Sequence, residues 1–284
     1  MDYNISTDLK MIREFFGLTQ EQLACELKIE KLRIARCESG ISNPRFEFLD
    51  LIYGYCFTNG LRLNEQKEMF YKDDLPNNHI LLTHASRDGL IGDINVDVAK
   101  SNNDFGKGFY CGDSYEKSVC FVARSKKASV YFLDFNPEGL TKVQFRVDQD
   151  WMLSIAYFRG RLDIYSNHPR IKKIIDNIKK CDYIIAPIAD NRMFEIIDEY
   201  IDGLITDEQC MHCLAATNLG YQYVFLTDKA INGITMLEKC FISSKEREYF
   251  IKEQVAFQKN GQNKSRLAKI EYKDKGQYIK EVLS

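Results

Sequence analysis

The spacing of apolar residues changes near residue 78, and this change limits the chain to a helical segment followed by a segment of mixed strands and helices. Before that point, from Leu9 to Cys56, apolar residues recur at the intervals of amphipathic helices. After it come β-branched and leucine-rich runs, which are typical of buried strands. With 284 residues, the chain is long enough to bury a core in both segments.

Five apolar runs predict strands in the second segment: HILLTHAS, SVYFLDF, KVQFRV, DYIIAPI and YQYVFLT. Helical patterns are expected at residues 150–158, 169–180, 192–201, 207–216 and 229–240. The strands and helices do not alternate regularly, and there is no GxGxxG turn, so a parallel nucleotide-binding sheet is disfavoured. We therefore predict an α+β domain over residues 79–242.

Composition excludes several classes of protein. No apolar run approaches the about 18 residues that span a bilayer, and the first residues lack the basic patch and apolar core of a secretory signal. The nine cysteines are an odd number scattered through apolar segments, which favours reduced thiols over a disulfide framework. The net charge of −2 indicates neither nucleic acid nor membrane by itself. We expect a cytoplasmic protein with no membrane partner.

One cysteine pair has the spacing of a zinc site. Cys210, His212 and Cys213 lie in the short motif CMHC, but no second ligand pair stands at a usable distance. Because the two cysteines share a face of the predicted helix, core packing is favoured and no metal is expected.

Residues 1–62 predict four or five short helices. Thr19 and Gln22 have the spacing of a capping box, which begins a helix that runs to about Leu27. The stretch LTQEQLACELKIEKLRIARCESGISNP resembles the helix-turn-helix of Cro and phage-repressor proteins. That resemblance implies a third helix in the major groove of DNA. The DNA contacts it implies are Gln20, Lys28, Lys31, Arg33 and Arg36.

Two interpretations of this segment stay open. It holds more acids than bases, a poor balance for neutralising phosphates unless the chain dimerises. It is therefore either a DNA-binding segment, aided by a homodimer, or a helical dimerisation or docking module. We expect a linker at residues 63–78 and a solvated, locally basic C-terminal extension at residues 243–284.

A tight glycine turn precedes an aromatic residue in the stretch NNDFGKGFYCGDSYEK. Gly106 and Gly108 let the backbone pass close to a neighbouring group, and Tyr110 follows at the end of a short extended segment. A tyrosine held there can stack on a flat heterocycle. The alternative is a core tyrosine that follows a hairpin turn.

A second resemblance covers most of the later segment. LLTHAS and DFGKGFYCGDSYEKSVCFVA resemble the first strand and the glycine-tyrosine turn of diphtheria-toxin-like and poly-ADP-ribose-polymerase-like ADP-ribosyltransferases. VYFLDF, CDYIIAPIADNRMFEIIDEYIDGLIT and YQYVFLTDKAI resemble a bacterial family of uncharacterised domains placed with that fold. The resemblance implies a split antiparallel β-sheet with flanking helices, and NAD as a substrate.

The resemblance also implies roles for single residues. His84 would bind the nicotinamide ribose of NAD, Tyr110 would stack on the nicotinamide, and Gln222 stands where the family has its catalytic glutamate. Glutamine can hydrogen-bond the ribose, but it has no charge and cannot act as a general base. The implied NAD-binding residues are His84, Ala85, Ser86, Gly108, Tyr110 and Phe121, with Ala85 in place of a usual glycine.

The two resemblances together predict an NAD-dependent mono-ADP-ribosyltransferase with an N-terminal helix-turn-helix. Its expected partners are NAD, a protein or nucleic-acid acceptor, DNA and a second copy of the chain. A toxin or defence role would fit such a layout. The alternative is a helix-turn-helix transcriptional regulator whose second domain senses an NAD-like ligand without catalysis.

Overall fold

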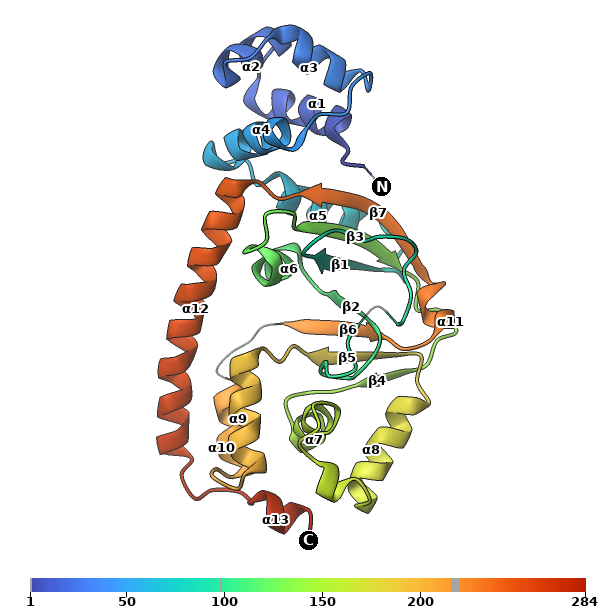
Figure 1. Cartoon of the computed structure of the whole chain (residues 1–284), viewed down its shortest axis with the longest axis vertical. Coiled ribbons are helices and arrows are strands. Elements are labelled where there is room, and N and C mark those ends of the chain that lie inside the picture. Colours follow the sequence, from blue (N-terminus) through green and yellow to red (C-terminus); the bar gives the residue numbers. More distant parts are fainter. Residues whose placement is uncertain (1, 98, 216–219) are drawn as a thin grey trace. The chain divides into compact units, whose positions relative to one another are not determined.

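The computed structural model describes residues 2–97, 99–215 and 220–284, and the chain divides into two compact units. Unit 1 comprises Met1–Ile91, Ser114–Phe135 and Thr235–Gln254, and unit 2 comprises Gly92–Asp113, Asn136–Ile234 and Val255–Ser284. Both units contain helices and strands, so the predicted mixed class is confirmed (Figure 1). Neither unit is a continuous stretch of sequence, and the units therefore differ from the domain boundaries predicted above.

Unit 1 begins with four helices, α1 (Ile5–Phe16), α2 (Gln20–Leu27), α3 (Lys31–Glu38) and α4 (Phe46–Thr58). The predicted capping box begins α2, since Thr19 Oγ1 accepts from the Gln22 amide and Gln22 Oε1 accepts from the Thr19 amide at 2.8 Å. The inward faces of the helices form one apolar core, which also contains Phe241. This helical segment therefore shares its core with a residue near the other end of the chain.

The strands of unit 1 are β1 (Ile80–Ser86), β3 (Ser129–Phe135) and β7 (Ile234–Phe241), side by side in that order. β1 and β3 are antiparallel, with Thr83 opposite Phe132 and His84 opposite Tyr131. Helices α5 (Leu63–Asp74) and α6 (Tyr115–Val122) pack on the Phe132 face. His84 and Tyr131 occupy alternate positions, so they lie on the opposite face.

Residues 63–78 are not simply a linker, because most of them form α5. Asn64 donates to the Tyr115 hydroxyl at 2.7 Å, and Lys67 donates to Glu238 Oε1 at 2.7 Å. Lys67 also pairs with Asp8 of α1. The buried face of α5 is therefore partly polar, and an apolar periodicity does not reveal it.

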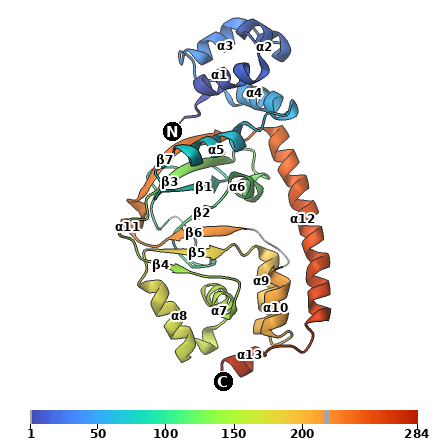
Figure 2. The same cartoon turned by 180° about the vertical axis from the view of Figure 1, so that it is seen from behind.

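Unit 2 contains a sheet with the strand order β4 (Lys142–Gln144), β5 (Tyr183–Pro187), β6 (Tyr221–Phe225) and β2 (Phe109–Gly112). β4 and β5 are parallel, and the other two pairs are antiparallel. One face packs on helices that lie together in both views (Figure 2). These are α7 (Gln149–Phe158), α8 (Pro169–Lys179), α9 (Asn191–Ile201) and α10 (Asp207–Ala215), which follow the predicted helical stretches.

The predicted helix at residues 229–240 is wrong over most of its length. Only the short helix α11 (Asp228–Ile231) forms there, and Gly233 separates it from β7. Ile234 and Thr235 are β-branched, which favours a strand. Pairing beside β3 therefore outweighs the helical spacing of the apolar residues in this stretch.

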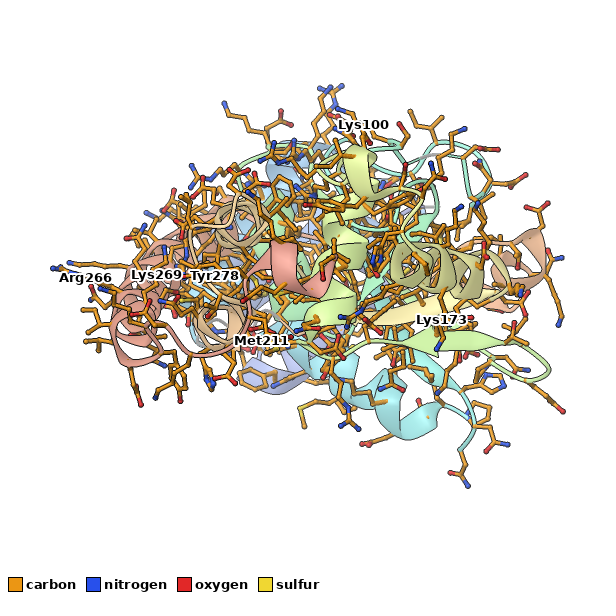
Figure 3. The ribbon with its side chains drawn as sticks, turned by 90° about the horizontal axis from the view of Figure 1, so that it is seen from below. Lys100, Lys173, Met211, Arg266, Lys269 and Tyr278 are labelled. Atoms are coloured by element: carbon orange, nitrogen blue, oxygen red, sulfur yellow. The ribbon has the colours of Figure 1, made fainter. Side chains whose placement is uncertain are left out.

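The C-terminal extension is largely helical and partly packed. It forms α12 (Ser244–Glu271) and α13 (Ile279–Val282). Within unit 2, Ser265 of α12 bonds to Arg192 and Cys213, while Arg266 extends outward (Figure 3). Among the described residues, no helix combines the length and apolar character that a membrane span requires.

We expect the stability of unit 1 to fall between pH 5 and 8 because of Glu246. Burial raises the pKa of this carboxyl from 4.5 to about 7, although hydrogen bonds from Tyr115 and Asn64 act in the opposite direction. The folded state therefore binds the proton more tightly, so this contribution is complete below pH 4.5 and is lost as the pH rises through 7.

Glu246→Gln should flatten this fall by about 2 kcal/mol of unfolding free energy, measured by urea denaturation across the pH range. Glu248→Gln, at an exposed position on the same helix, is the matched control. Parallel pH profiles for the wild type and Glu246→Gln would contradict the prediction.

Candidate active site

The register of β2 and β6 brings two predicted site residues to one face of unit 2. Gly112 lies opposite Gln222, and Tyr110 lies opposite Val224. Directly opposed residues in an antiparallel pair share a face, and so do residues two positions apart along a strand. Tyr110 and Gln222 therefore lie on the same face, and Val224 and Ala186 on that face belong to the core beneath the helices.

Tyr110 is fixed by the glycine turn that precedes it. Its hydroxyl donates to the Gly106 carbonyl at 2.7 Å and accepts from the Phe105 amide at 3.1 Å. Burial raises the pKa of the phenol well above its ordinary value. The ring packs against the core and remains partly exposed, so its contacts match the core interpretation, and stacking on a flat heterocycle stays a prediction.

Gly108 permits β2 to lie close against β6. A Cβ at this position would stand 2.9 Å from the Phe225 carbonyl oxygen and 3.0 Å from Val224 Cγ1. Backbone cannot move away from such a contact as a flexible side chain can. The glycine predicted to allow a close approach therefore makes that approach to a neighbouring strand.

Gln222 belongs to a buried polar cluster with Asp104 and Arg159. Its Nε2 donates to Asp104 Oδ2 at 2.9 Å and to the Pro187 carbonyl at 3.1 Å. Asp104 Oδ1 accepts from Arg159 Nη2 at 2.5 Å, and Oδ2 also accepts from the Ala189 amide at 3.3 Å. Gln222 and Asp104 are 7% and 6% exposed, so these bonds form largely away from water.

This cluster was only partly predicted. Asp104 stands two residues before Gly106, within the stretch singled out in the sequence, but no spacing rule connects it to residue 222. Arg159 follows α7, and its guanidinium also lies over the Phe194 ring at 4.5 Å. An acidic residue next to a glycine turn was the signal that the sequence offered.

The other predicted NAD-binding residues belong to unit 1. His84, Ala85 and Ser86 form the end of β1, and the ring centroids of His84 and Tyr131 are 6.4 Å apart. Phe121 is 46% exposed on α6. Since α6 contacts the Thr83 face of β1 through Ser118, the structure does not bring Phe121 to the His84 face. The NAD contact that the resemblance implies for Phe121 stays a prediction.

The five residues predicted to contact DNA divide into two groups. Gln20 donates to Glu38 Oε2 at 2.7 Å, and Arg13 donates to both oxygens of the same carboxylate. Burial alone would raise the pKa of Glu38, but these bonds outweigh it and lower the pKa. Gln20 is thus engaged within the helical segment.

The basic residues of this set are exposed. Lys31 and Arg33 share α3 with Arg36, and Lys28 lies just before that helix. Lys31 stands 3.3 Å from Glu21, and Arg33 lies 4.1 Å from the centroid of Phe48. The buried side of α3 consists of Ile34, Cys37 and Glu38. Its outer side therefore presents the predicted cations.

Cys210 and Cys213 are buried in α10. The thiol of Cys213 donates to the Ser265 carbonyl at 3.3 Å. No group of three or more histidine, cysteine or acidic side chains that could hold a metal ion occurs within residues 2–97, 99–215 and 220–284.

Residues 80–236 match the family described as "Protein of unknown function (DUF3990)". The match covers more than half of the chain, so the chain belongs to this family. The matched segment contains His84, Tyr110, Gln222 and the cluster around Asp104, and α1 to α5 precede it. Comparison with curated proteins and with solved structures gave no match.

We expect Gly108→Ala to lower the unfolding free energy by about 1–3 kcal/mol, because the added methyl group overpacks the contact between β2 and β6. Chemical denaturation of the full chain would measure this loss. Lys107→Ala, at the exposed position next to Gly108, is the control. Equal stability of the two variants would contradict the prediction.

Proposed function

We propose that the chain is an NAD-dependent ADP-ribosyltransferase whose glycine-tyrosine turn and Gln222 act together on the nicotinamide ribose. The observation that carries this proposal is the arrangement of Tyr110 and Gln222 on one face of paired strands, with a buried carboxylate bonded to Gln222. The segment that matches the family contains both residues and His84.

The polar groups fit a sugar that carries hydroxyl groups. Both protons of the Gln222 amide are used by Asp104 and Pro187, so Oε1 is the acceptor of this side chain. Arg159 Nε is buried and has no hydrogen-bond partner among the described residues. A sugar hydroxyl can donate to an acceptor such as Gln222 Oε1 and accept from a donor such as Arg159 Nε. The cluster therefore contains both an acceptor and a donor for hydroxyl groups.

In the proposed reaction, the bond between ribose C1′ and nicotinamide N1 of NAD breaks, and its electron pair stays on nicotinamide. A nucleophile of the acceptor forms the new bond to C1′ and loses its proton to solvent. Positive charge develops on the ribose as nicotinamide leaves, so acceptors placed beside the ribose hydroxyls lower the barrier. Gln222 is assigned this binding role, and Tyr110 is assigned to the nicotinamide ring. For His84, a residue of unit 1, the ribose contact is the role that the resemblance implies.

Gln222→Ala and His84→Ala should each lower kcat/KM for nicotinamide release from NAD by about 100- to 1,000-fold, the size seen when one preorganised polar contact is lost. Release would be measured on the purified full chain, with and without cell lysate as a source of acceptor. Gln144→Ala, an exposed glutamine on β4, should leave the rate unchanged.

A wild-type chain that releases no nicotinamide under either condition would refute the enzymatic proposal. Binding of NAD without turnover would instead favour the ligand-sensing regulator. Labelled protein or nucleic acid in the lysate would identify the class of acceptor.

We further propose that α2 and α3 act as a helix-turn-helix that brings the enzyme to DNA. The capped start of α2, the turn at Lys28 and the exposed cations of α3 support this role. The Arg13–Glu38–Gln20 cluster holds α1, α2 and α3 together, which would keep the outer side of α3 in a fixed orientation.

Arg36→Ala should weaken binding to duplex DNA and reduce the slope of log affinity against log salt by about 1, because one phosphate contact is lost. Fluorescence anisotropy with labelled duplex at several salt concentrations would measure both quantities. Arg266→Ala, which removes an exposed arginine from α12, is the matched control. An equal effect of both substitutions would argue against a specific role for α3.

A further inference from the structure

We propose that Asp104 is a positioning residue that enables Gln222 to bind the nicotinamide ribose in the place of a glutamate. This inference rests on the proposed function. It concerns a residue of unit 2 that the sequence did not single out, and its geometry is complete within that unit.

Asp104 fixes the orientation of the Gln222 amide. The two acceptors around Nε2 are Asp104 Oδ2 and the Pro187 carbonyl, at 2.9 and 3.1 Å. If the amide were turned over, its oxygen would face two other oxygens, which is repulsive. The NH₂ group therefore points toward Asp104, and the carbonyl Oε1 is directed elsewhere as an acceptor.

The two oxygens of Asp104 have separate partners. Oδ1 is bonded to Arg159 at 2.5 Å, while Oδ2 accepts from Gln222 and from the Ala189 amide. Arg159 is itself held over the Phe194 ring. The arginine therefore holds the carboxylate in place without occupying the oxygen that meets Gln222.

A carboxylate bonded to an amide also changes the amide as an acceptor. Hydrogen bonds in series polarise one another, so donation from Nε2 to an anion makes Oε1 more negative. The effect is larger away from water, and both side chains are buried. Asp104 thereby supplies, through the amide, part of the negative charge that glutamine lacks.

The experiment measures nicotinamide release from NAD by the full chain with Asp104→Asn, Gln222→Glu and the double variant. Asp104→Asn should lower kcat by about 10- to 100-fold, the usual size when the partner of a ligand-binding side chain is lost, with a smaller change in KM. In the Gln222→Glu background, Asp104→Asn should instead raise kcat. There Asp104 faces a second carboxylate, and replacing it relieves their repulsion.

Because Asp104 and Gln222 are in contact, their effects need not add whatever the role, so each rate is compared with the thermal unfolding temperature of the same variant. A purely structural role would change the rate only where the unfolding temperature also changes. The pH profile is a second readout. Gln222→Glu alone should show a higher apparent pKa on its acid side than the double variant, because neighbouring carboxylates share a proton. Asp198→Asn is the control and should have no effect on the rate. It removes a carboxylate of α9 that is paired with Arg161.

The outcomes separate the two proposals. No turnover by the wild type overturns the proposed function and this inference with it. Turnover by the wild type with an unchanged rate for Asp104→Asn, or an equal loss in both backgrounds, overturns the role of Asp104 alone. Thermal unfolding of each variant checks the fold. If Asp104→Asn unfolds, Asp104→Ser replaces it, with the same reversal expected.

Discussion

The antiparallel pairing of β2 with β6 is the constraint on which the candidate site depends. It places Gly112 opposite Gln222 and puts Tyr110 on the same face. A shift of one residue would turn one of these two side chains to the other face. Gly108 keeps the two strands close at the other end of the pair, where any Cβ would meet backbone. The glycine turn therefore helps to fix the register of β2 against β6, in addition to bending the chain.

Each unit buries a set of charged and polar side chains that are bonded to one another. In unit 2, Asp104, Arg159 and Gln222 are joined by hydrogen bonds. In unit 1, Lys67 lies between Asp8 and Glu238. Removing one partner of such a set would leave a buried charge uncompensated, which is far more costly than losing an exposed ion pair. These clusters therefore restrict which side chains the neighbouring positions can accept.

Apolar periodicity was sufficient to predict most strands and helices, because each has an apolar face that the pattern records. It failed where the buried face is polar, as in α5, and where strand pairing outweighed a helical spacing, as in β7. For the candidate site, the family resemblance suggested Tyr110 and Gln222, whereas only the structure showed that Asp104 lies beside Gln222. A contact between residues 104 and 222 depends on the path of the intervening chain, and no local rule encodes it. Phe121 is a different case: the resemblance implies a contact with NAD, whereas α6 packs through Ser118 on the Thr83 face of β1, away from His84.

Phe241 makes the folding of the first four helices depend on a strand that is synthesised much later. It lies in β7, yet its ring packs among Tyr3, Phe46 and Tyr53 in the core of the first helices. A ribosome makes α1 to α4 first, but their core lacks this ring until β7 has been synthesised. A prematurely terminated product therefore carries the whole of α3 on an unfinished core. The native core of the first four helices is completed only in molecules whose β-strands have all been translated.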